Sequence, residues 1–276
     1  MGFKLVSDSS SNVRQLSGVE YANVPMKIIT STAEYVDDAS LDVQDMVEQV
    51  RQTKGKSGTS CPNIHEWLQA FGEAQNVFAV TITSNLSGSC TAARQAGQEY
   101  ESEHPGRRVC VLDSLSTGPE MGLILEKLKE WILQELSFDM IREKIQAYME
   151  KTHLLFSLQS LTNLARNGRV NPAVAKLAGV LGIRIVGMAS EEGTLQTLHK
   201  CRGEKKTLDT LFTEMKRLGF SGGKARISHC LNLESANSLK ERILDAFPRS
   251  DVRIEPCTAL CSFYAEQGGL LVGFEG

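Results

Sequence analysis

The sequence predicts an α/β fold with two lobes, in which the N-terminal lobe holds a parallel sheet and the C-terminal lobe a mixed sheet. Strand-like runs alternate with amphipathic helical runs, and a unit of strand, hydroxyl-rich turn and helix occurs three times in the first half. In the second half, Glu191, Glu192 and Gly193 join two strand-like runs, which is the pattern of an antiparallel hairpin. The 276 residues exceed one average domain of about 100–200 residues, so we expect two closely packed domains, 1–151 and 152–276.

Each of the three repeated units has small hydroxyl residues directly after its strand. In the first unit a strand over 3–6 is followed by Asp8 and three serines, and the other two units cover 77–96 and 109–125. Because ligands of open α/β sheets bind beyond the carboxyl ends of the strands, we expect the three turns to converge on one crevice. Helix amino termini there offer unpaired N–H groups, and Ser and Thr hydroxyls add donors without charge. The pattern predicts a binding site for an anion.

The remaining elements follow from hydrophobic periodicity. Apolar residues at helical spacing predict helices that bury one face, and Ser40 is the expected cap of the first of them. These helices cover 41–53, 121–135, 138–150, 207–218 and 234–247. After the hairpin that begins at Gly182, short apolar runs predict strands over 224–230, 251–255 and 269–274.

The segment Thr59-Ser60-Cys61-Pro62 is the first candidate ligand-binding motif. It precedes a predicted helix that contains Trp67, and proline is favoured in the first turn of a helix. Ser60 or Cys61 would then cap the helix, and a plain helix cap is the alternative interpretation of the whole segment.

The turns after the second and third strands supply the other candidate ligands. Ser87 and Ser89 flank Gly88, where the absence of a side chain lets the backbone approach a bound group. Ser114 follows Asp113 in the third turn, and Asp113 is expected to cap or pin neighbouring loops. Helix capping alone is again the alternative. Neither a P-loop nor a nucleophile elbow is present, because no GKS, GKT or GxSxG sequence occurs in these turns.

Composition excludes several classes of protein. The formal net charge of -3 gives no basic footprint for nucleic acid. The longest apolar stretch, 177–189, contains Arg184 and three glycines and is shorter than the roughly 20 residues of a membrane span. The start of the chain does not resemble a secretory signal, so we expect a cytoplasmic protein with reduced cysteines. Cys257 and Cys261 are the closest cysteine pair, but no histidine lies beside them, so no metal site is expected.

The sequence offers no obvious base for nucleophilic catalysis. The histidines are scattered, and only His229 ends an apolar strand, where a structural role is the commoner one. A hydrolase that uses Ser87 is therefore a weaker alternative than a binding protein.

Three arginines lie in basic groups of the second half. Arg166 and Arg169 flank Asn167-Gly168, which is predicted to stop a helix over 158–170, and cations complement a helix carboxyl terminus. Arg202 belongs to a basic group after the hairpin, for which a solvated surface is the simplest interpretation.

Taken in order, these motifs resemble those of the DegV family of bacterial fatty-acid-binding proteins, over nearly the whole length. Each motif is weak alone, whereas the ordered set is specific. The motifs are Asp8-Ser9-Ser10-Ser11, Thr59-Ser60-Cys61-Pro62, Leu86-Ser87-Gly88-Ser89, Asp113-Ser114 with Gly118 and Gly122, residues 161–170, and residues 193–203.

The resemblance implies a two-lobed protein that holds a long-chain fatty acid between its lobes, with no further cofactor. The carboxyl would bind Thr59 or Ser60, Ser87 and the backbone from Gly88 to Ser89. Family members of this type are not catalysts but present the carboxyl to a separate fatty acid kinase for phospholipid synthesis. A peripheral contact with the membrane would serve ligand exchange.

The resemblance also implies which residues contact a partner. At one position, however, this sequence departs from the pattern of the family. Arg166, Arg169 and Arg202 match family arginines, and Arg202 is the better candidate for docking the kinase. Family members carry a histidine at the carboxyl site, whereas Cys261 stands approximately at its place here, with Thr258 or Ser262 as substitutes. Phe263 and Tyr264 add bulk near that site. A divergent member with another small anionic ligand, or with an interaction role, is therefore the alternative.

Overall fold

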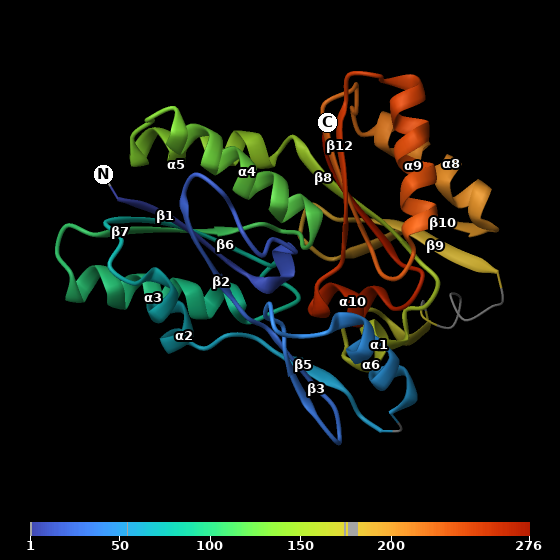
Figure 1. Ribbon diagram of the computed structural model, residues 1–276, viewed down its shortest axis with the longest axis horizontal. Coiled ribbons are helices and arrows are strands. Elements are labelled where there is room, and N and C mark those ends of the chain that lie inside the picture. Colours follow the sequence, from blue (N-terminus) through green and yellow to red (C-terminus); the bar gives the residue numbers. More distant parts are fainter. Residues whose placement is uncertain (1, 54, 174, 176–181) are drawn as a thin grey trace.

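The computed structural model describes residues 2–53, 55–173, 175 and 182–276. The N-terminal half contains a parallel sheet in the order β2-β1-β6-β7. Its strands are β1 (Phe3–Asp8), β2 (Glu20–Val24), β6 (Asn76–Thr81) and β7 (Arg108–Asp113). Helices α2 (Ile64–Phe71) and α3 (Ser89–Glu103) cover one face, and α4 (Pro119–Leu133) and α5 (Phe138–Met149) cover the other (Figure 1).

Alternating side chains of these strands explain why both faces are covered. In β1, Leu5 points to the core under α4 and α5, whereas the next residue, Val6, points to the core under α2 and α3. In β6, Phe78 and Val77 divide in the same way between the two cores. A strand that is apolar on both faces needs helices on both sides, as parallel sheets do in general.

The C-terminal half contains a mixed sheet in the order β10-β9-β8-β13-β11-β12, in which β11 and β12 are parallel and the other pairs antiparallel. Its strands are β8 (Thr152–Leu158), β9 (Ile183–Ala189), β10 (Leu195–Arg202), β11 (Lys224–His229), β12 (Asp251–Pro256) and β13 (Leu270–Glu275). Helices α8 (Glu204–Arg217) and α9 (Leu233–Ala246) cover one face. Helix α4 contacts β8, β11 and β13 as well as β1 and β6, so it lies between the two sheets. The predicted fold class is confirmed.

A third, small sheet in the order β4-β3-β5 lies beside the place where the halves meet (Figure 1). Its strands are β3 (Lys27–Ile29), β4 (Glu34–Val36) and β5 (Gly58–Ser60). The remaining helices are η1 (Ser9–Ser11), α1 (Val43–Gln52), α6 (Thr162–Arg166) and α10 (Ala259–Ala265). Helix α10 contacts η1, β3, α1 and α6, so elements from both halves of the chain surround it.

Several predicted boundaries were wrong for identifiable reasons. Asp42, not Ser40, caps α1 by accepting from the Asp45 amide. Asn63, not Ser60 or Cys61, caps α2, because Asn63 and Glu66 form a reciprocal capping box that satisfies two backbone donors at once. The helix predicted over 158–170 is the short α6, because its first residue is still the end of β8.

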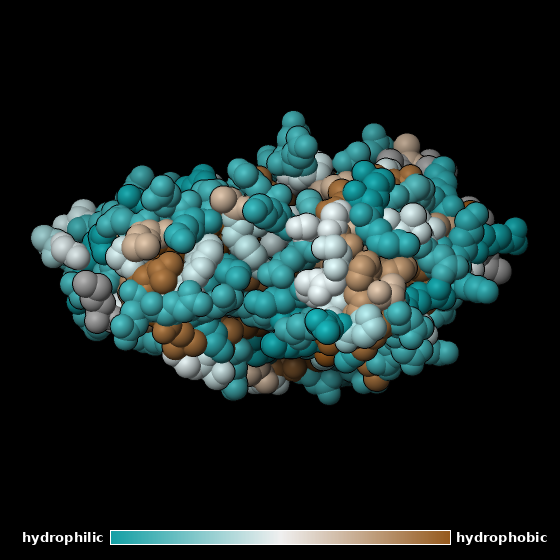
Figure 2. All heavy atoms as spheres, turned by 90° about the horizontal axis from the view of Figure 1, so that it is seen from above, coloured by the Kyte–Doolittle hydropathy of each residue, from teal (hydrophilic) through white to brown (hydrophobic). Residues whose placement is uncertain are grey.

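The surface shown in Figure 2 is mainly hydrophilic, with apolar residues in small separate groups. Among the described residues, no helix combines the length and the apolar character needed to cross a bilayer. Residues 177–181 of the long apolar stretch lie outside the described residues.

Candidate functional site

The buried carboxylate of Asp8 joins the first two hydroxyl-rich turns. It accepts hydrogen bonds from the Ile82 amide at 3.0 Å and the Ser89 hydroxyl at 2.6 Å, and both the amide and the hydroxyl of Ser10 donate to it. Burial raises the pKa of Asp8 although these four hydrogen bonds act in the opposite direction. The start of α3 is thereby tied to the end of β1.

The third turn is tied to the other two through backbone hydrogen bonds. The Thr83 amide donates to the Ser116 carbonyl at 2.9 Å, and the Gly118 amide donates to the Ser10 carbonyl at 2.7 Å. Asp113 accepts from the amides of Ser84 and Leu115, both at 3.1 Å, so it pins the loops as predicted. The three turns therefore meet at one edge of the parallel sheet.

A second buried carboxylate, Glu120, joins these turns to the C-terminal half. It accepts from the Ser116 hydroxyl at 2.5 Å and from the Thr152 hydroxyl, at the start of β8, at 2.8 Å. Burial raises the pKa of Glu120 to about 7, although the two hydroxyls lower it.

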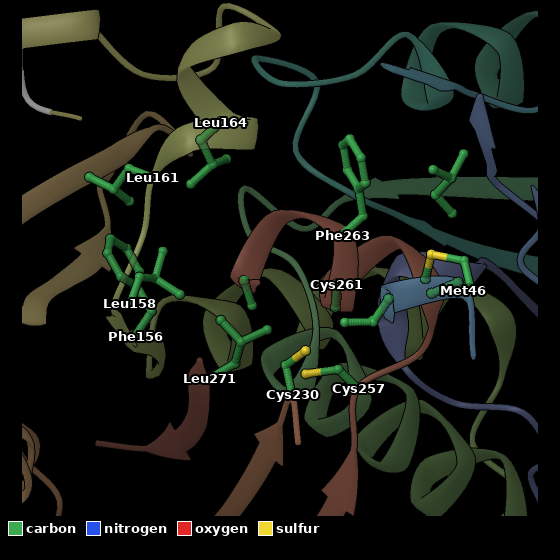
Figure 3. Close-up of a cluster of buried hydrophobic side chains, with 14 of the residues drawn as sticks. Met46, Phe156, Leu158, Leu161, Leu164, Cys230, Cys257, Cys261, Phe263 and Leu271 are labelled. Carbon is green, nitrogen blue, oxygen red and sulfur yellow. The ribbon is translucent and has the colours of Figure 1, made fainter. Parts of the chain in front are cut away.

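A cavity of about 170 Å³ lies between the turns and the C-terminal sheet. This volume would hold several water molecules. Most of its wall is apolar, and most of the side chains that β8, α6, β13 and α10 contribute to it belong to the cluster of Figure 3. Among the apolar wall residues are Leu154, Phe156, Leu158, Leu164, Leu260 and Leu271.

One part of the cavity wall is polar. The hydroxyls of Thr59 and Tyr264 are 2.8 Å apart, and the Arg169 guanidinium lies 5.9 Å from the centre of the Tyr264 ring. Arg169 also donates from Nε to the Leu86 carbonyl at 3.3 Å, next to Ser87. Among the described residues of the wall, Arg169 carries the only formal charge, and none is a histidine or a carboxylate. This end of the cavity therefore suits an anion.

The predicted ligands divide into two groups. Thr59, Ser87, Gly88 and Cys261 are in the cavity wall, whereas the structure places Ser60, Ser89 and Ser114 outside it. The three outside have physical reasons to be there. Ser60 lies in an extended strand, where successive side chains point to opposite sides, so its side chain points away from the cavity that Thr59 lines. The Ser89 hydroxyl donates its hydrogen to Asp8 instead. Ser114 bonds within its own turn, to the backbone of Ser116.

The remaining predicted residues are placed as follows. The Cys261 thiol donates to the Ser10 carbonyl at 3.4 Å, and burial raises its pKa to about 12, so it is a neutral group.

Arg166 and Arg202 are exposed, whereas Arg169 lines the cavity. Tyr264, which the sequence suggested only as bulk, is the hydroxyl that faces Thr59. Within the described parts of the chain, no group of three or more His, Cys, Asp or Glu residues could hold a metal ion.

Comparison with known proteins matches this arrangement to one family. A family model described as "Uncharacterised protein, DegV family" matches residues 2–275. The chain belongs to the DegV family. A DegV domain-containing protein of Streptococcus pneumoniae is 43% identical over 279 residues, which cover 100% of this chain and 99% of that protein.

Two solved DegV structures are similar over almost their whole length. The Fatty Acid Kinase (Fak) B3 protein of Streptococcus pneumoniae, loaded with linoleic acid, is 43% identical with a TM-score of 0.98, covering 100% of this chain and 99% of that one. A DegV family protein from Eubacterium eligens, loaded with heptadecanoic acid, is 43% identical with a TM-score of 0.97 and covers 99% of both chains.

The turn between β9 and β10 closes one side of the cavity and leads to a prediction about Gly193. The φ angle of Gly193 is +72°, and a Cβ added to this residue would collide with the Thr83 hydroxyl and lie 2.9 Å from the Leu115 carbonyl oxygen. We expect Gly193→Ala to displace the turn and to lower the free energy of unfolding, measured in urea, by about 1–3 kcal/mol more than backbone strain alone. Gly203→Ala is the matched control, because the φ angle of Gly203 is also positive, at +83°, whereas a Cβ added there would meet no atom within 4 Å. Equal losses in the two variants would contradict the close docking of the turn.

Proposed function

We propose that this DegV protein binds a long-chain fatty acid in the cavity and presents its carboxyl group to a separate fatty acid kinase. The observation that carries the proposal is that apolar walls and a polar, positively charged end at Thr59, Ser87 and Arg169 belong to the same cavity. Burying each methylene of the tail contributes roughly 0.8 kcal/mol, so the tail supplies most of the affinity and the polar end fixes its direction. The fatty acids held by the two similar DegV structures support the same ligand class.

In this proposal the two halves of the chain have different tasks. Residues 1–151 supply most of the head-group site, with Thr59, Ser87 and the backbone at Gly88 as ligands of the carboxylate. Residues 152–276 form one lobe that covers the tail through β8, β13 and α6. Ser60, Ser89 and Ser114 support the site from outside the wall, and Cys261 contributes packing.

The same geometry supports a carrier without catalytic activity of its own. A serine nucleophile needs a base within hydrogen-bond reach, and the described wall residues around Ser87 include no histidine, aspartate or glutamate. The exposed Arg166 and Arg202 are available to contact an acidic surface of the kinase. The similarity to the Fak B3 protein supports that kind of partner.

The first test is native mass spectrometry of protein purified from bacteria, followed by extraction of any retained small molecule. We expect a fatty acid near one equivalent. Ser87→Ala is expected to weaken the binding of added oleic acid roughly tenfold, because it removes a hydrogen bond to a charged group. Ser84→Ala, on the exposed side of the same turn, is the control and should bind like the wild type. A wild-type protein that carries no lipid and binds no added fatty acid would refute the proposed function.

A further inference from the structure

Tyr264 is held in a fixed position at the polar end of the cavity. The amides of Ala259 and Leu260, at the start of α10, donate to the buried Asp37 carboxylate at 2.9 and 3.0 Å. At the other end of α10, the Asn163 side chain donates to the Phe263 carbonyl at 2.8 Å. Because both ends of this short helix are anchored by buried or half-buried groups, the tyrosine side chain starts from a rigid backbone.

The ring of Tyr264 is fixed as well. It packs edge-on against Phe263, with ring centres 4.9 Å apart, and lies beside both the core under α4 and the cluster that lines the cavity. The guanidinium of Arg169, which also lines the cavity, is 5.9 Å from the centre of the Tyr264 ring. The hydroxyl is thus presented to the cavity end where Thr59 lies, 205 positions earlier in the chain.

The pairing of the two hydroxyls leaves a donor available. Thr59 and Tyr264 have one hydroxyl hydrogen each, and their mutual hydrogen bond uses only one of them. A carboxylate has two equivalent acceptor oxygens, so it can receive one hydrogen bond from each residue once the pair separates. An ester presents only neutral oxygens, and hydrogen bonds to them are roughly half as strong as those to a charged carboxylate.

We propose that Tyr264 is a ligand of the head group and makes the site select a free carboxylate over an esterified acyl chain. This inference rests on the proposed function. It assigns to Tyr264 the donor role that the Cys261 thiol is poorly placed to fill, because that thiol already donates to the Ser10 carbonyl.

The test compares oleic acid with methyl oleate as ligands of the full-length protein, freed of bound lipid. Tyr264→Phe is expected to weaken the binding of oleic acid about tenfold, which corresponds to about 1.4 kcal/mol, and to weaken the binding of methyl oleate by less than about threefold. The ester measurement shows at the same time that the variant still folds around its cavity. Tyr264→His, which restores a ring donor, is expected to recover part of the preference for the acid.

Tyr100→Phe is the matched control. It also deletes one phenol hydroxyl, but this hydroxyl donates to the carbonyls of Gly72 and Ala74, in the core under α2 and α3. Its affinity for oleic acid should equal that of the wild type. A Tyr264→Phe protein that keeps the full preference for the acid, or that loses acid and ester equally, would overturn the role of Tyr264 alone. A wild type that binds neither ligand would overturn the proposed function.

Discussion

Replacing Asp8 with alanine is expected to lower the free energy of unfolding by about 3–5 kcal/mol. The substitution leaves the Ile82 amide, the Ser89 hydroxyl and the Ser10 amide in the interior without their acceptor. Each unsatisfied buried donor costs roughly 1–3 kcal/mol, and partial relaxation of the turns reduces the sum. Urea denaturation followed by circular dichroism measures the loss, provided that the slope with denaturant concentration is unchanged.

Asp38 provides a matched control for this prediction. Like Asp8 with Ser10, it accepts from the amide and the hydroxyl of the residue two positions later, Ser40, at 2.8 and 2.6 Å. Asp38 is far less buried, and water can replace its hydrogen bonds, so Asp38→Ala should cost less than about 1 kcal/mol. Similar losses in the two variants would show that Asp8 is not the buried link between β1 and α3 that the hydrogen bonds indicate.

Much of the fold could be predicted because long elements bury side chains with a clear period. The strand β6 and the helix α4 both combine that signal with a hydroxyl-rich turn between strand and helix. The three-residue strands β3, β4 and β5 were missed, since so few residues show no period. Helix α10 was missed for another reason: nearly all its side chains are buried, and a short helix that is apolar all round has no amphipathic pattern.

The sequence predicts which turns form the site, but not the direction in which each side chain of those turns points. Spacing along the chain shows that Ser87 and Ser89 are close, but not that only Ser87 reaches the cavity while Ser89 turns to Asp8. Similarly, the histidine position of the family drew attention to Cys261, whereas the hydroxyl at the polar end comes from Tyr264, one turn of helix later. Such choices depend on contacts between residues far apart in sequence, which no local pattern contains.

Glu120 provides the second large expected effect, because its charge is disfavoured where the two halves of the protein meet. In the described structure its carboxyl group contacts hydroxyls rather than a cation, and those hydroxyls belong to the third turn and to β8. Its pKa is about 7 in the folded protein, whereas an unperturbed glutamate ionises near 4.5. Between these pH values the folded state keeps a proton that the unfolded chain has released.

The stability that Glu120 contributes is therefore fully present below pH 4.5 and is lost as the pH rises through about 7. At about 1.4 kcal/mol per pKa unit, the loss is about 3 kcal/mol. Glu120→Gln keeps an uncharged side chain that can bond both Ser116 and Thr152, so its stability should not show this loss. Urea denaturation of both proteins between pH 5 and pH 9 measures the difference, with the exposed Glu143→Gln as the control. If the free energies of unfolding of the wild type and of Glu120→Gln changed equally with pH, the carboxyl group of Glu120 would not titrate with the raised pKa. The two curves should diverge between about pH 4.5 and 7 and stay a constant distance apart at higher pH. Because Ser116 also lines the cavity, such a divergence would link the ionisation of Glu120 to the contact between the cavity wall and the C-terminal sheet.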